Sequence, residues 1–441
     1  MSAPLQYRIE GGSARGIADS VERGIEAGSL RPGDPLPTVR GLSAQLGVSP
    51  TTVSAAIAEL RTRGLVVTRE RSASQVSWRP PVAAPLPGPP VAAGARDLAS
   101  GNPDPALLPD PAPFLRKMDP PCQLYGGAPF VAELLQLGRA ELEADGIDTE
   151  HFAVVSGALD GIERVLQAQL RPGDAVAVED PGFAGLFDLL RALGLILRPI
   201  PIDERGMLAD ALAEALEEGV EAVILNPRGQ NPTGAALDPR RAGELCAALE
   251  RHPAVLVVED DHLGPIAGAP RLTVTGGRLR WAAARSVAKS LGPDLRLALL
   301  AGDAQTIGRV GGRQSVGPGW VSHLLQRLVA SIWADGGVAT TLERATEAYG
   351  KRRQALLDAL AAEGIEASGA SGISVWIPVP QETPVVAALA ERGWAVASGA
   401  PFRLRSAPAI RVTTSALHVD EAPQLTAAIA AVLQPRGTRT A

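Results

Sequence analysis

The chain has 441 residues, of which 46% are hydrophobic and 20% charged, and its net charge is −6. This length favours two or more domains. No apolar run approaches the ~18–20 residues of a transmembrane helix, and the first residues lack the basic region and apolar core of a signal peptide. The two cysteines provide neither a disulfide framework nor a metal cluster. We therefore expect a cytoplasmic protein without a membrane partner or a metal.

Lysine is rare in this chain. The 42 basic residues include only three lysines, Lys117, Lys289 and Lys351. Any chemistry that requires a side-chain primary amine therefore has three candidates. The charge is also divided unevenly, because residues 1–79 hold ten arginines and seven acidic residues, whereas the remaining chain holds 32 basic and 41 acidic residues.

The front of the chain has the pattern of a helix-turn-helix. Apolar residues recur at helical spacing over residues 15–27 and predict a first helix. Thr38 can cap a short second helix over residues 39–45. After a turn, Pro50 suits the first turn of a third helix over residues 50–63.

A hairpin and a linker complete this front module. Residues 65–68 and 74–77 favour two short strands, so residues 1–78 are predicted to form a winged helix-turn-helix domain. The segment 79–96, RPPVAAPLPGPPVAAGAR, contains six prolines and can form neither a helix nor a central strand. We expect it to be an extended linker that separates a basic module from the acidic module of residues 97–441.

The large module alternates between strands and helices. Helix-length segments such as 159–170 and 239–251 lie between buried runs, which predicts a mainly parallel, seven-stranded α/β sheet covered on both faces. Functional groups should then lie on loops that follow the carboxyl ends of strands. The strand-like runs are 153–155, 175–179, 196–202, 222–225, 255–259, 281–287 and 296–301.

A smaller α+β segment follows. Long helices are predicted near residues 319–333 and 339–363. Strands are then expected at 373–379, 394–398 and 410–413, and a closing helix from Asp420.

Lys289 lies just past a predicted strand, with Ser286 three residues before it and Arg296 seven residues after it. An aldehyde cofactor that carries a phosphate requires an amine for a Schiff base, and hydroxyl and cationic groups for the phosphate. This segment supplies all three groups. A surface lysine in a loop is the ordinary alternative, but the scarcity of lysine favours the functional interpretation.

Other strand ends carry compatible groups. Residues 156–159 open a helix whose N–H groups can bind a phosphate. Phe183, after the strand that ends in Glu179, is suited to stack on a pyridine ring or to belong to the core. The segment 226–234 contains two Asn-Pro pairs, and the segment 259–262 places adjacent carboxylates at a strand end. Such carboxylates require a nearby cation, for which a protonated pyridine nitrogen is suitable.

The order of these segments resembles the fold-type I pyridoxal-phosphate aminotransferases, over residues 97–434. The front module resembles the GntR-type winged helix, over residues 5–77, in the runs LRPGDPLPTVR at 30–40 and LGVS at 46–49. The fusion of the two modules in this order resembles the MocR family of bacterial transcriptional regulators. The resemblance implies a DNA-binding domain followed by an α/β aminotransferase-like domain that binds pyridoxal 5'-phosphate and dimerises.

The resemblance also implies a role for each matching residue. Lys289 forms the Schiff base with the cofactor. Asp260 pairs with the pyridine nitrogen, and Asp261 is the alternative because the doublet leaves the register open by one residue. Arg411 clamps the carboxylate of a substrate or effector. The remaining implied cofactor-binding residues are Ala158, Leu159, Ser286 and Arg296 at the phosphate, Asn231 and His262 at the ring hydroxyl, Phe183 at the ring face, and Tyr125 at the phosphate of the partner subunit.

For the front module, the resemblance implies that residues 50–63 form a recognition helix in the major groove of double-stranded DNA. Arginines that only solvate a small basic domain are the alternative, and the sequence pattern carries this inference more than the charge does. The implied DNA-binding residues are Thr38, Arg40, Ser49, Thr51 and Thr52, with Arg69 and Arg71 on the wing.

The preferred hypothesis is a homodimeric transcriptional regulator that senses an amino compound or pyridoxal phosphate. The alternative is an active aminotransferase that acts on an amino acid and carries an accessory DNA-binding domain. A third hypothesis is a winged helix fused to a scaffold that binds no cofactor. His262 stands where a tyrosine is common, and Ala158 and Leu159 lack the hydroxyl and amide common in that loop. These departures favour ligand binding without efficient turnover and permit residual aminotransferase activity.

Overall fold

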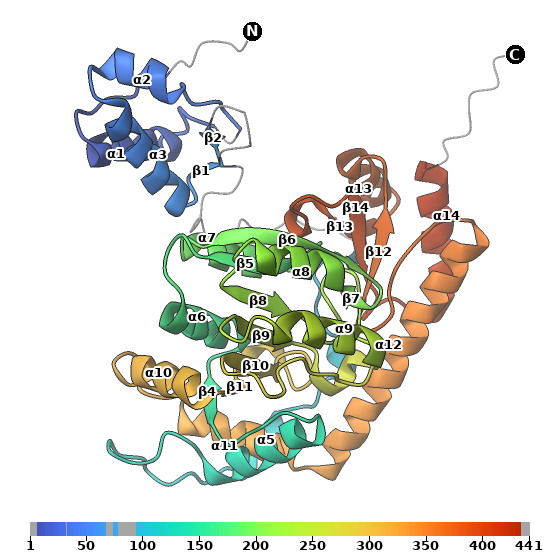
Figure 1. Ribbon diagram of the computed structural model, residues 1–441. Helices are drawn as coiled ribbons and strands as arrows, with labels where there is room; N and C mark the ends of the chain where they lie inside the picture. The colour runs from blue at the N-terminus through green and yellow to red at the C-terminus, as the bar shows by residue number, and fades with distance from the viewer. Residues whose placement is uncertain (1–6, 32, 68–73, 78–93, 434–441) are drawn as a thin grey trace, which may run out of the picture. The chain divides into compact units, whose positions relative to one another are not determined.

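The computed structural model describes residues 7–31, 33–67, 74–77 and 94–433 (Figure 1). Its N-terminal part is a winged helix-turn-helix with a core formed by all three helices and the hairpin. Its elements are α1 (Ala14–Glu26), α2 (Val39–Leu46), α3 (Pro50–Thr62), β1 (Val66–Val67) and β2 (Gln75–Val76).

Local sequence signals explain where these helices begin and end. The side chains of Ser13, Thr38 and Ser49 each accept a hydrogen bond from a backbone N–H group in the first turn of α1, α2 and α3. Gly47 ends α2 with a φ of 66°, a conformation that glycine adopts without strain. The predicted second and third helices are thus confirmed with nearly the predicted bounds.

The connector before α2 takes part in the wing. Val66 pairs with Val76 in the antiparallel hairpin β1–β2. On the other edge of β2, Pro35 forms a bridge with Gln75, and the Leu36 amide donates to the Ser74 carbonyl at 2.7 Å. The segment that the sequence presents as a turn-rich connector therefore also adds a short strand-like pairing to the wing.

The C-terminal part contains a large sheet of eight strands within the described residues (Figure 1). The neighbouring strands β5, β8, β9 and β10 are parallel, whereas β11 runs antiparallel to both β10 and β4. All seven predicted strands are present, and the eighth is the two-residue edge strand β7. In sheet order the strands are β4 (Phe152–Val155), β11 (Ala298–Gly302), β10 (Trp281–Ser286), β9 (Leu256–Asp261), β8 (Ala222–Leu225), β5 (Ala175–Asp180), β6 (Ile196–Asp203) and β7 (Gly206–Met207).

Alternate side chains of the central strands face different helices. Leu299 and Ala301 belong to a core shared with α5 and α11, whereas Leu300 reaches Gly161 of α6. This alternation follows from the two-residue period of a strand and covers both faces of the sheet. The helices of this part are α4 (Ala112–Lys117), α5 (Ala132–Ala144), α6 (Ala158–Gln169), α7 (Ala184–Ala192), α8 (Ala209–Glu217), α9 (Pro239–Glu250), α10 (Ala304–Ser315), α11 (His323–Trp333) and α12 (Gly336–Ala362).

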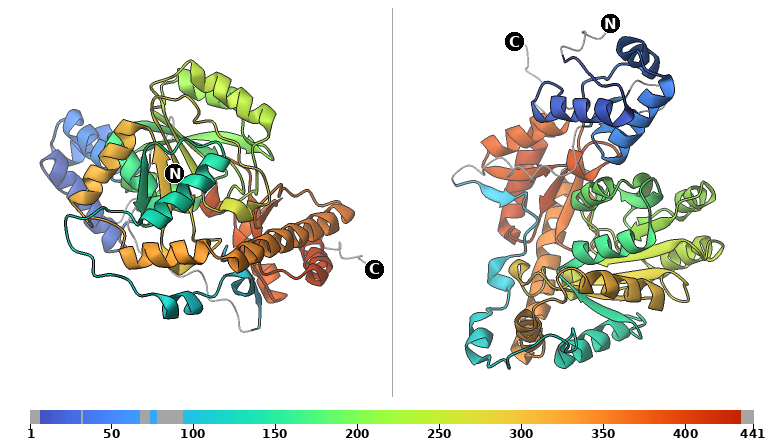
Figure 2. Two further views of the ribbon diagram at one scale, coloured as in Figure 1. Left: turned by 90° about the horizontal axis from the view of Figure 1, so that it is seen from below. Right: turned by 90° about the vertical axis from the view of Figure 1, so that its left-hand side faces the viewer.

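A second sheet follows the long helix α12, which runs from α11 to the C-terminal elements (Figures 1 and 2). Its strand order is β12 (Ser374–Pro378), β14 (Ala409–Thr413), β13 (Trp394–Ser398) and β3 (Arg96–Leu98), and its helices are α13 (Glu382–Glu391) and α14 (Ala422–Leu433). The sequence does not predict β3, which pairs in parallel with β13 across almost 300 residues of chain. The first residue of β3 is the last residue of the predicted linker, and residues 78–93 lie outside the described part.

Short 3-10 helices complete the described chain: η1 (Pro105–Leu107), η2 (Gly264–Ala267), η3 (Pro293–Leu295), η4 (Ala400–Phe402) and η5 (Val419–Glu421). Over the residues that the structure describes, no helix has the length and apolarity needed to cross a membrane.

Candidate functional site

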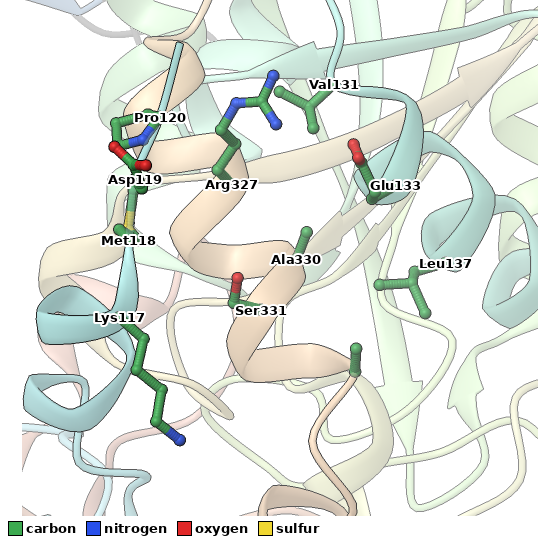
Figure 3. Close-up of a pocket in the computed structure, with 11 residues that line it drawn as sticks. Lys117, Met118, Asp119, Pro120, Val131, Glu133, Leu137, Arg327, Ala330 and Ser331 are labelled. Carbon is green, nitrogen blue, oxygen red and sulfur yellow. The ribbon is translucent and has the colours of Figure 1, made fainter.

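The three lysines occupy different environments. Lys289 is half-buried on the loop after β10, whereas Lys117 and Lys351 are exposed. Lys351 pairs with Glu347 one turn away on α12. Lys117 ends α4 beside a pocket that is also lined by Glu133 of α5 and Arg327 of α11 (Figure 3). Lys289 alone among the three lysines lies on a loop that follows a strand of the large sheet.

The amine of Lys289 is hydrogen-bonded and has a lowered pKa. Its Nζ donates a hydrogen bond to the Gly101 carbonyl at 2.6 Å. Burial, together with the positive charge of Arg411, lowers the pKa of the Lys289 amine to about 8. The unprotonated amine, which is the form that attacks an aldehyde, is therefore more abundant at neutral pH than for an ordinary lysine, although most of the amine still carries its proton.

Arg411 on β14 lies close to Lys289. Its guanidinium donates to the Ala99 carbonyl and, at 3.1 Å, to Oδ1 of Asn231, and its Cζ lies 4.6 Å from the centre of the Phe402 ring. Burial lowers the pKa of Arg411 to about 10, so the group remains a cation at neutral pH. The fold thus brings together Lys289, Asn231 and Arg411, which are up to 180 residues apart in the chain.

The two adjacent aspartates at the end of β9 differ completely. Asp261 accepts a bidentate pair of hydrogen bonds from Arg228, at 3.2 and 3.0 Å, and lies 2.7 Å from Nε of Arg285. Burial opposes ionisation, but Arg285, Arg228 and Arg271 hold the pKa of Asp261 well below its usual range. Asp261 is therefore an ionised carboxylate whose charge is balanced by buried arginines.

Asp260 has the opposite environment. It is buried, and its Oδ1 has no hydrogen-bond partner among the described residues. Burial and the negative charge of Asp261 raise the pKa of Asp260 to about 7. A buried carboxylate with a free oxygen attracts a cationic donor, so the geometry favours Asp260 over Asp261 as the partner of a pyridine nitrogen.

Asn226 and Glu179 also belong to this cluster, although neither was predicted as a site residue. Asn226 Nδ2 donates to the Asp260 carbonyl at 2.7 Å and lies 3.3 Å from Nδ1 of His262. Burial and the nearby charge of Lys289 lower the pKa of His262 to about 4, so its ring is neutral at pH 7. Burial raises the pKa of Glu179, which accepts from the Asn226 amide, to about 8. Their position at strand ends was the signal that could have identified both residues.

Two of the predicted phosphate-binding segments meet at the start of α6. Ala158 and Leu159 are its first residues, and Gly157 precedes them with a φ of 110°. A Cβ atom at Gly157 would lie only 3.2 Å from the guanidinium of Arg296. Arg296 itself has a φ of 40°, the one positive value at a non-glycine position in the described chain. The amides of α6 and the cation of Arg296 therefore face a common space.

Two of the predicted cofactor-binding residues are aromatic, Phe183 and Tyr125. Phe183 is half-buried just after β5. Tyr125 is 93% exposed between α4 and α5, where its ring packs edge-on against Trp320 at 5.7 Å. The fold of one chain thus leaves Tyr125 on the surface.

A buried ion-pair network lies beside the cluster. Arg285 pairs with Glu141 at 2.6 Å and with Asp145, which also accepts from Arg228 at 3.2 Å. Through Asp261, the network joins the loop after β8, the end of β9, and β10, each of which carries a predicted cofactor residue. Arg285, an arginine inside the apolar strand β10, was the overlooked signal. Within the described residues, no group of His, Cys, Asp and Glu side chains could hold a metal ion.

The candidate DNA-binding surface is formed by the starts of α2 and α3. Thr38, Arg40, Ser49 and Thr51 are exposed. The Ser49 hydroxyl lies 2.7 Å from that of Thr51 and 2.8 Å from that of Thr52, which makes a compact polar group at the start of α3. The predicted wing contacts, Arg69 and Arg71, lie outside the described residues.

Comparisons with known families match both parts of the chain. Residues 129–429 match the aminotransferase class I and II family, and residues 13–76 match the gntR family of bacterial regulatory proteins. The vitamin B6 salvage pathway transcriptional repressor PtsJ of Salmonella typhimurium is 40% identical over 426 residues, which cover 96% of this chain and 98% of the relative. The regulator TauR of Rhodobacter capsulatus is 29% identical, over 85% and 84% of the two chains. The pyridoxine biosynthesis regulator PdxR of Corynebacterium glutamicum is 29% identical over 55% of each.

Solved structures show the same fold. The chain resembles an archaeal alanine:glyoxylate aminotransferase, with a TM-score of 0.70 and 22% identity over 77% of this chain and 90% of that one. A kynurenine aminotransferase of Pyrococcus horikoshii gives a TM-score of 0.71 and 21% identity over 78% and 92%. With the match to PtsJ over almost its whole length, these findings show that the chain belongs to the MocR family of transcriptional regulators, in which a GntR-type DNA-binding domain precedes a fold-type I aminotransferase domain.

Proposed function

We propose that this regulator binds pyridoxal 5'-phosphate through Lys289, binds double-stranded DNA through the start of α3, and responds to an amino compound or to pyridoxal phosphate itself. The observation that carries the proposal is the unpartnered, buried Oδ1 of Asp260. A protonated pyridine nitrogen would supply both a hydrogen-bond donor and a positive charge to this oxygen.

The surroundings of Asp260 fit the rest of the cofactor ring. Asn231 Oδ1 accepts from Arg411, which leaves the amide NH2 of Asn231 available to donate to the ring hydroxyl. Neutral His262 is linked to Asp260 through the side chain of Asn226. Phe183 follows β5, whose end also carries Glu179, and would cover one ring face.

The phosphate has donors from three segments. The Ser286 hydroxyl accepts from the Ala288 amide at 3.2 Å, so its own O–H remains free to donate. Arg296 supplies a cation, and the first N–H groups of α6, at Ala158 and Leu159, supply backbone donors. When bound, pyridoxal phosphate supplies an aldehyde that reacts with amines and a ring that withdraws electrons.

Arg411 would bind the carboxylate of an amino compound. Its guanidinium is buried, and its Nε has no hydrogen-bond partner among the described residues. A carboxylate would accept two parallel hydrogen bonds from such a group and would offset the loss of its hydration. The proposal therefore includes effectors that carry both an amine, to reach the cofactor, and a carboxylate.

Contacts of residues 99–101 support a route from this site towards the linker. The Ala99 carbonyl accepts from Arg411, and the Gly101 carbonyl accepts from Lys289. Ligands that use Arg411 or Lys289 compete with these carbonyls. Residues 99–101 follow β3 directly. A ligand that displaces the hydrogen bonds to their carbonyls would therefore change how firmly the chain after the linker is held in the C-terminal domain. Regulation requires that the effector bind with different affinity to the arrangement that keeps these hydrogen bonds and to the arrangement that lacks them.

The names of two relatives favour vitamin B6 as the regulated pathway. PtsJ is named for vitamin B6 salvage and PdxR for pyridoxine biosynthesis. We propose that this protein controls genes for the supply of pyridoxal phosphate and uses its own cofactor as the signal. The alternative of an enzyme is less favoured, because PtsJ is named as a repressor and aligns with 96% of the chain.

We propose residues 1–78 as the DNA-binding domain, 79–96 as a linker and 97–441 as the cofactor-binding and dimerisation domain. A homodimer is supported by large apolar side chains that are exposed in the C-terminal domain, which include Leu124, Tyr125, Val316 and Leu324. Tyr125 would reach the cofactor phosphate of the partner subunit.

The test is to map the DNA fragments bound by the purified protein, with and without pyridoxal phosphate. We expect sites near genes of vitamin B6 supply, with occupancy that changes when the cofactor is added. Unchanged binding would contradict the proposed signal. Sustained turnover of an amino donor with a keto acid, at rates typical of enzymes, would contradict the regulator as the primary role.

A further inference from the structure

The loop between β13 and β14 supports the side chain of Arg411, beside the hydrogen bonds that Arg411 donates to Asn231 and Ala99. Phe402, in this loop, is buried and packs edge-on against Trp376 at 6.4 Å. Its ring also lies against the Arg411 guanidinium, whose Cζ is 4.6 Å from the ring centre. A displacement of Phe402 would therefore move or release the cation that faces Lys289.

Two buried carboxylates, Glu382 and Asp180, hold this loop. Glu382 of α13 accepts from the Ser398 hydroxyl, the Arg403 guanidinium and the amides of Ala400 and Ala409. These bonds tie the loop to its own small sheet. Asp180 instead ends β5 of the large sheet, and it accepts four hydrogen bonds from Leu404, Arg405 and Ser406.

All four bonds to Asp180 are well formed. Oδ1 accepts from the Leu404 amide at 2.8 Å and the Ser406 hydroxyl at 2.9 Å, and Oδ2 accepts from the amides of Arg405 at 2.6 Å and Ser406 at 3.0 Å. An ionised carboxylate has lone pairs for all of these donors. An asparagine in its place would direct an NH2 group at backbone N–H groups and leave buried donors unsatisfied.

The same segment reaches Phe183. Two residues after Asp180, the Gly182 amide donates to the Phe402 carbonyl at 2.7 Å. Ala184 packs against the cluster formed by Trp376, Phe402 and Ala409. Phe183 therefore lies between two residues that are attached to the loop that supports Arg411.

We propose that Asp180 is a positioning residue for ligand recognition, which fixes Phe402 and hence Arg411 relative to Phe183 and the end of β5. This inference rests on the proposed function, because it assigns the carboxylate of an amino compound to Arg411. Asp180 acts through the loop 402–406 and touches neither the ligand nor the cofactor. A carboxylate bound at Arg411 would in turn tighten the loop and the segment of Phe183, since coupling between two sites is reciprocal.

The experiment compares Asp180→Asn with Asp303→Asn in the full-length protein. Asp303 is a matched control because its carboxylate also accepts backbone N–H groups, from Trp281 and Thr306, at the start of α10. Ser406→Ala removes one of the four donors to Asp180 and serves if Asp180→Asn does not fold. Each variant, loaded with pyridoxal phosphate, is titrated with alanine, as both enantiomers, and with ethylamine, which is alanine without its carboxylate. The visible absorbance reports binding.

In the wild-type protein, alanine should bind more tightly than ethylamine. We expect this preference to fall at least about fivefold in Asp180→Asn, about twofold in Ser406→Ala, and not at all in Asp303→Asn, since lost hydrogen bonds have effects of this order. A merely structural role would weaken both ligands equally. An unchanged preference in a folded Asp180→Asn or Ser406→Ala protein overturns the inference.

Hydrogen exchange in the cofactor-free protein separates this inference from the proposed function. Amides of residues 404–406 should exchange faster in Asp180→Asn than in the wild type, and unchanged protection overturns the inference. A wild-type protein that shows no absorbance change with pyridoxal phosphate contradicts the proposed function instead, and the exchange measurement still decides whether Asp180 holds the loop.

Discussion

The candidate DNA-binding surface and the candidate cofactor site are built in opposite ways. The DNA-binding side chains come from residues 38–52, are largely exposed, and include hydroxyls that cap their own helices. The cofactor cluster joins Gly101, Asp260, Lys289 and Arg411, which are far apart in the chain, and places several charges in the interior. Exposed charges are weakly coupled and tolerate change, whereas each buried charge depends on its partner. Substitutions should therefore have graded effects on the first surface and large ones on the second.

The largest effect expected in the buried cluster is that of Lys289→Ala. Pyridoxal phosphate bound to a lysine amine absorbs visible light, and we expect this absorbance to disappear in Lys289→Ala after unbound cofactor is removed. Lys117→Ala and Lys351→Ala should retain it, because both side chains are exposed and lie away from the cluster. A band that survives in Lys289→Ala would refute the assignment of this site.

Asp261→Asn should produce the next largest effect. It would remove the carboxylate that neutralises Arg228 and Arg285 in the interior. Loss of one partner of a buried ion pair typically destabilises a protein by about 3–5 kcal/mol, which urea unfolding of the cofactor-free protein would measure. Glu347→Gln, which removes the partner of the exposed Lys351, is the surface control. A loss below about 1 kcal/mol would show that water replaces the lost partner.

Asp260→Asn should stabilise the cofactor-free protein, whereas Asp261→Asn should destabilise it. The pKa of Asp260 is raised to about 7, so its contribution to folding is present below the pKa of the unfolded chain and is lost as the pH rises towards and through 7. An asparagine cannot ionise. The cofactor-free variant should therefore melt at a higher temperature than the wild type at pH 8, with a smaller difference at pH 5, while its affinity for pyridoxal phosphate falls at least about tenfold. Equal melting temperatures at both pH values would contradict this.

The smallest effect is expected at the DNA-binding surface. Arg40→Ala should weaken binding to all DNA sequences alike and reduce the slope of log K against log salt by about 1 per subunit, as for one lost phosphate contact. Arg15→Ala, on the exposed side of α1, is the matched control. An unchanged slope in Arg40→Ala would place the phosphate contacts elsewhere on the domain.

Much of the fold could be predicted because its signals are local. Caps, turns and hydrophobic periodicity located α2, α3 and the strands of the large sheet to within a few residues. β3 could not be predicted, because three residues carry no periodicity and their partner β13 is almost 300 residues away. The pairing of residues 33–36 with β2 was missed because so short a run carries no periodicity.

The candidate site divides in the same way. The scarcity of lysine and its position after a strand singled out Lys289, and the resemblance of motifs pointed to Asn231 and Arg411. The choice between Asp260 and Asp261 remained open, since the two residues are chemically identical and adjacent. Only their partners distinguish them, and those partners come from other segments, Arg228 from the loop after β8 and Arg285 from β10.

The sequence alone therefore determined the order of the elements, the helix caps and the amine available for chemistry, because these depend on residue type and on neighbours within a few positions. The tertiary structure alone decided which aspartate keeps a free oxygen, which carbonyls face Lys289 and Arg411, and how Asp180 holds the loop of Phe402. These properties depend on burial and on contacts between distant segments, and a buried charge acquires its pKa only when the folded chain has replaced water around it.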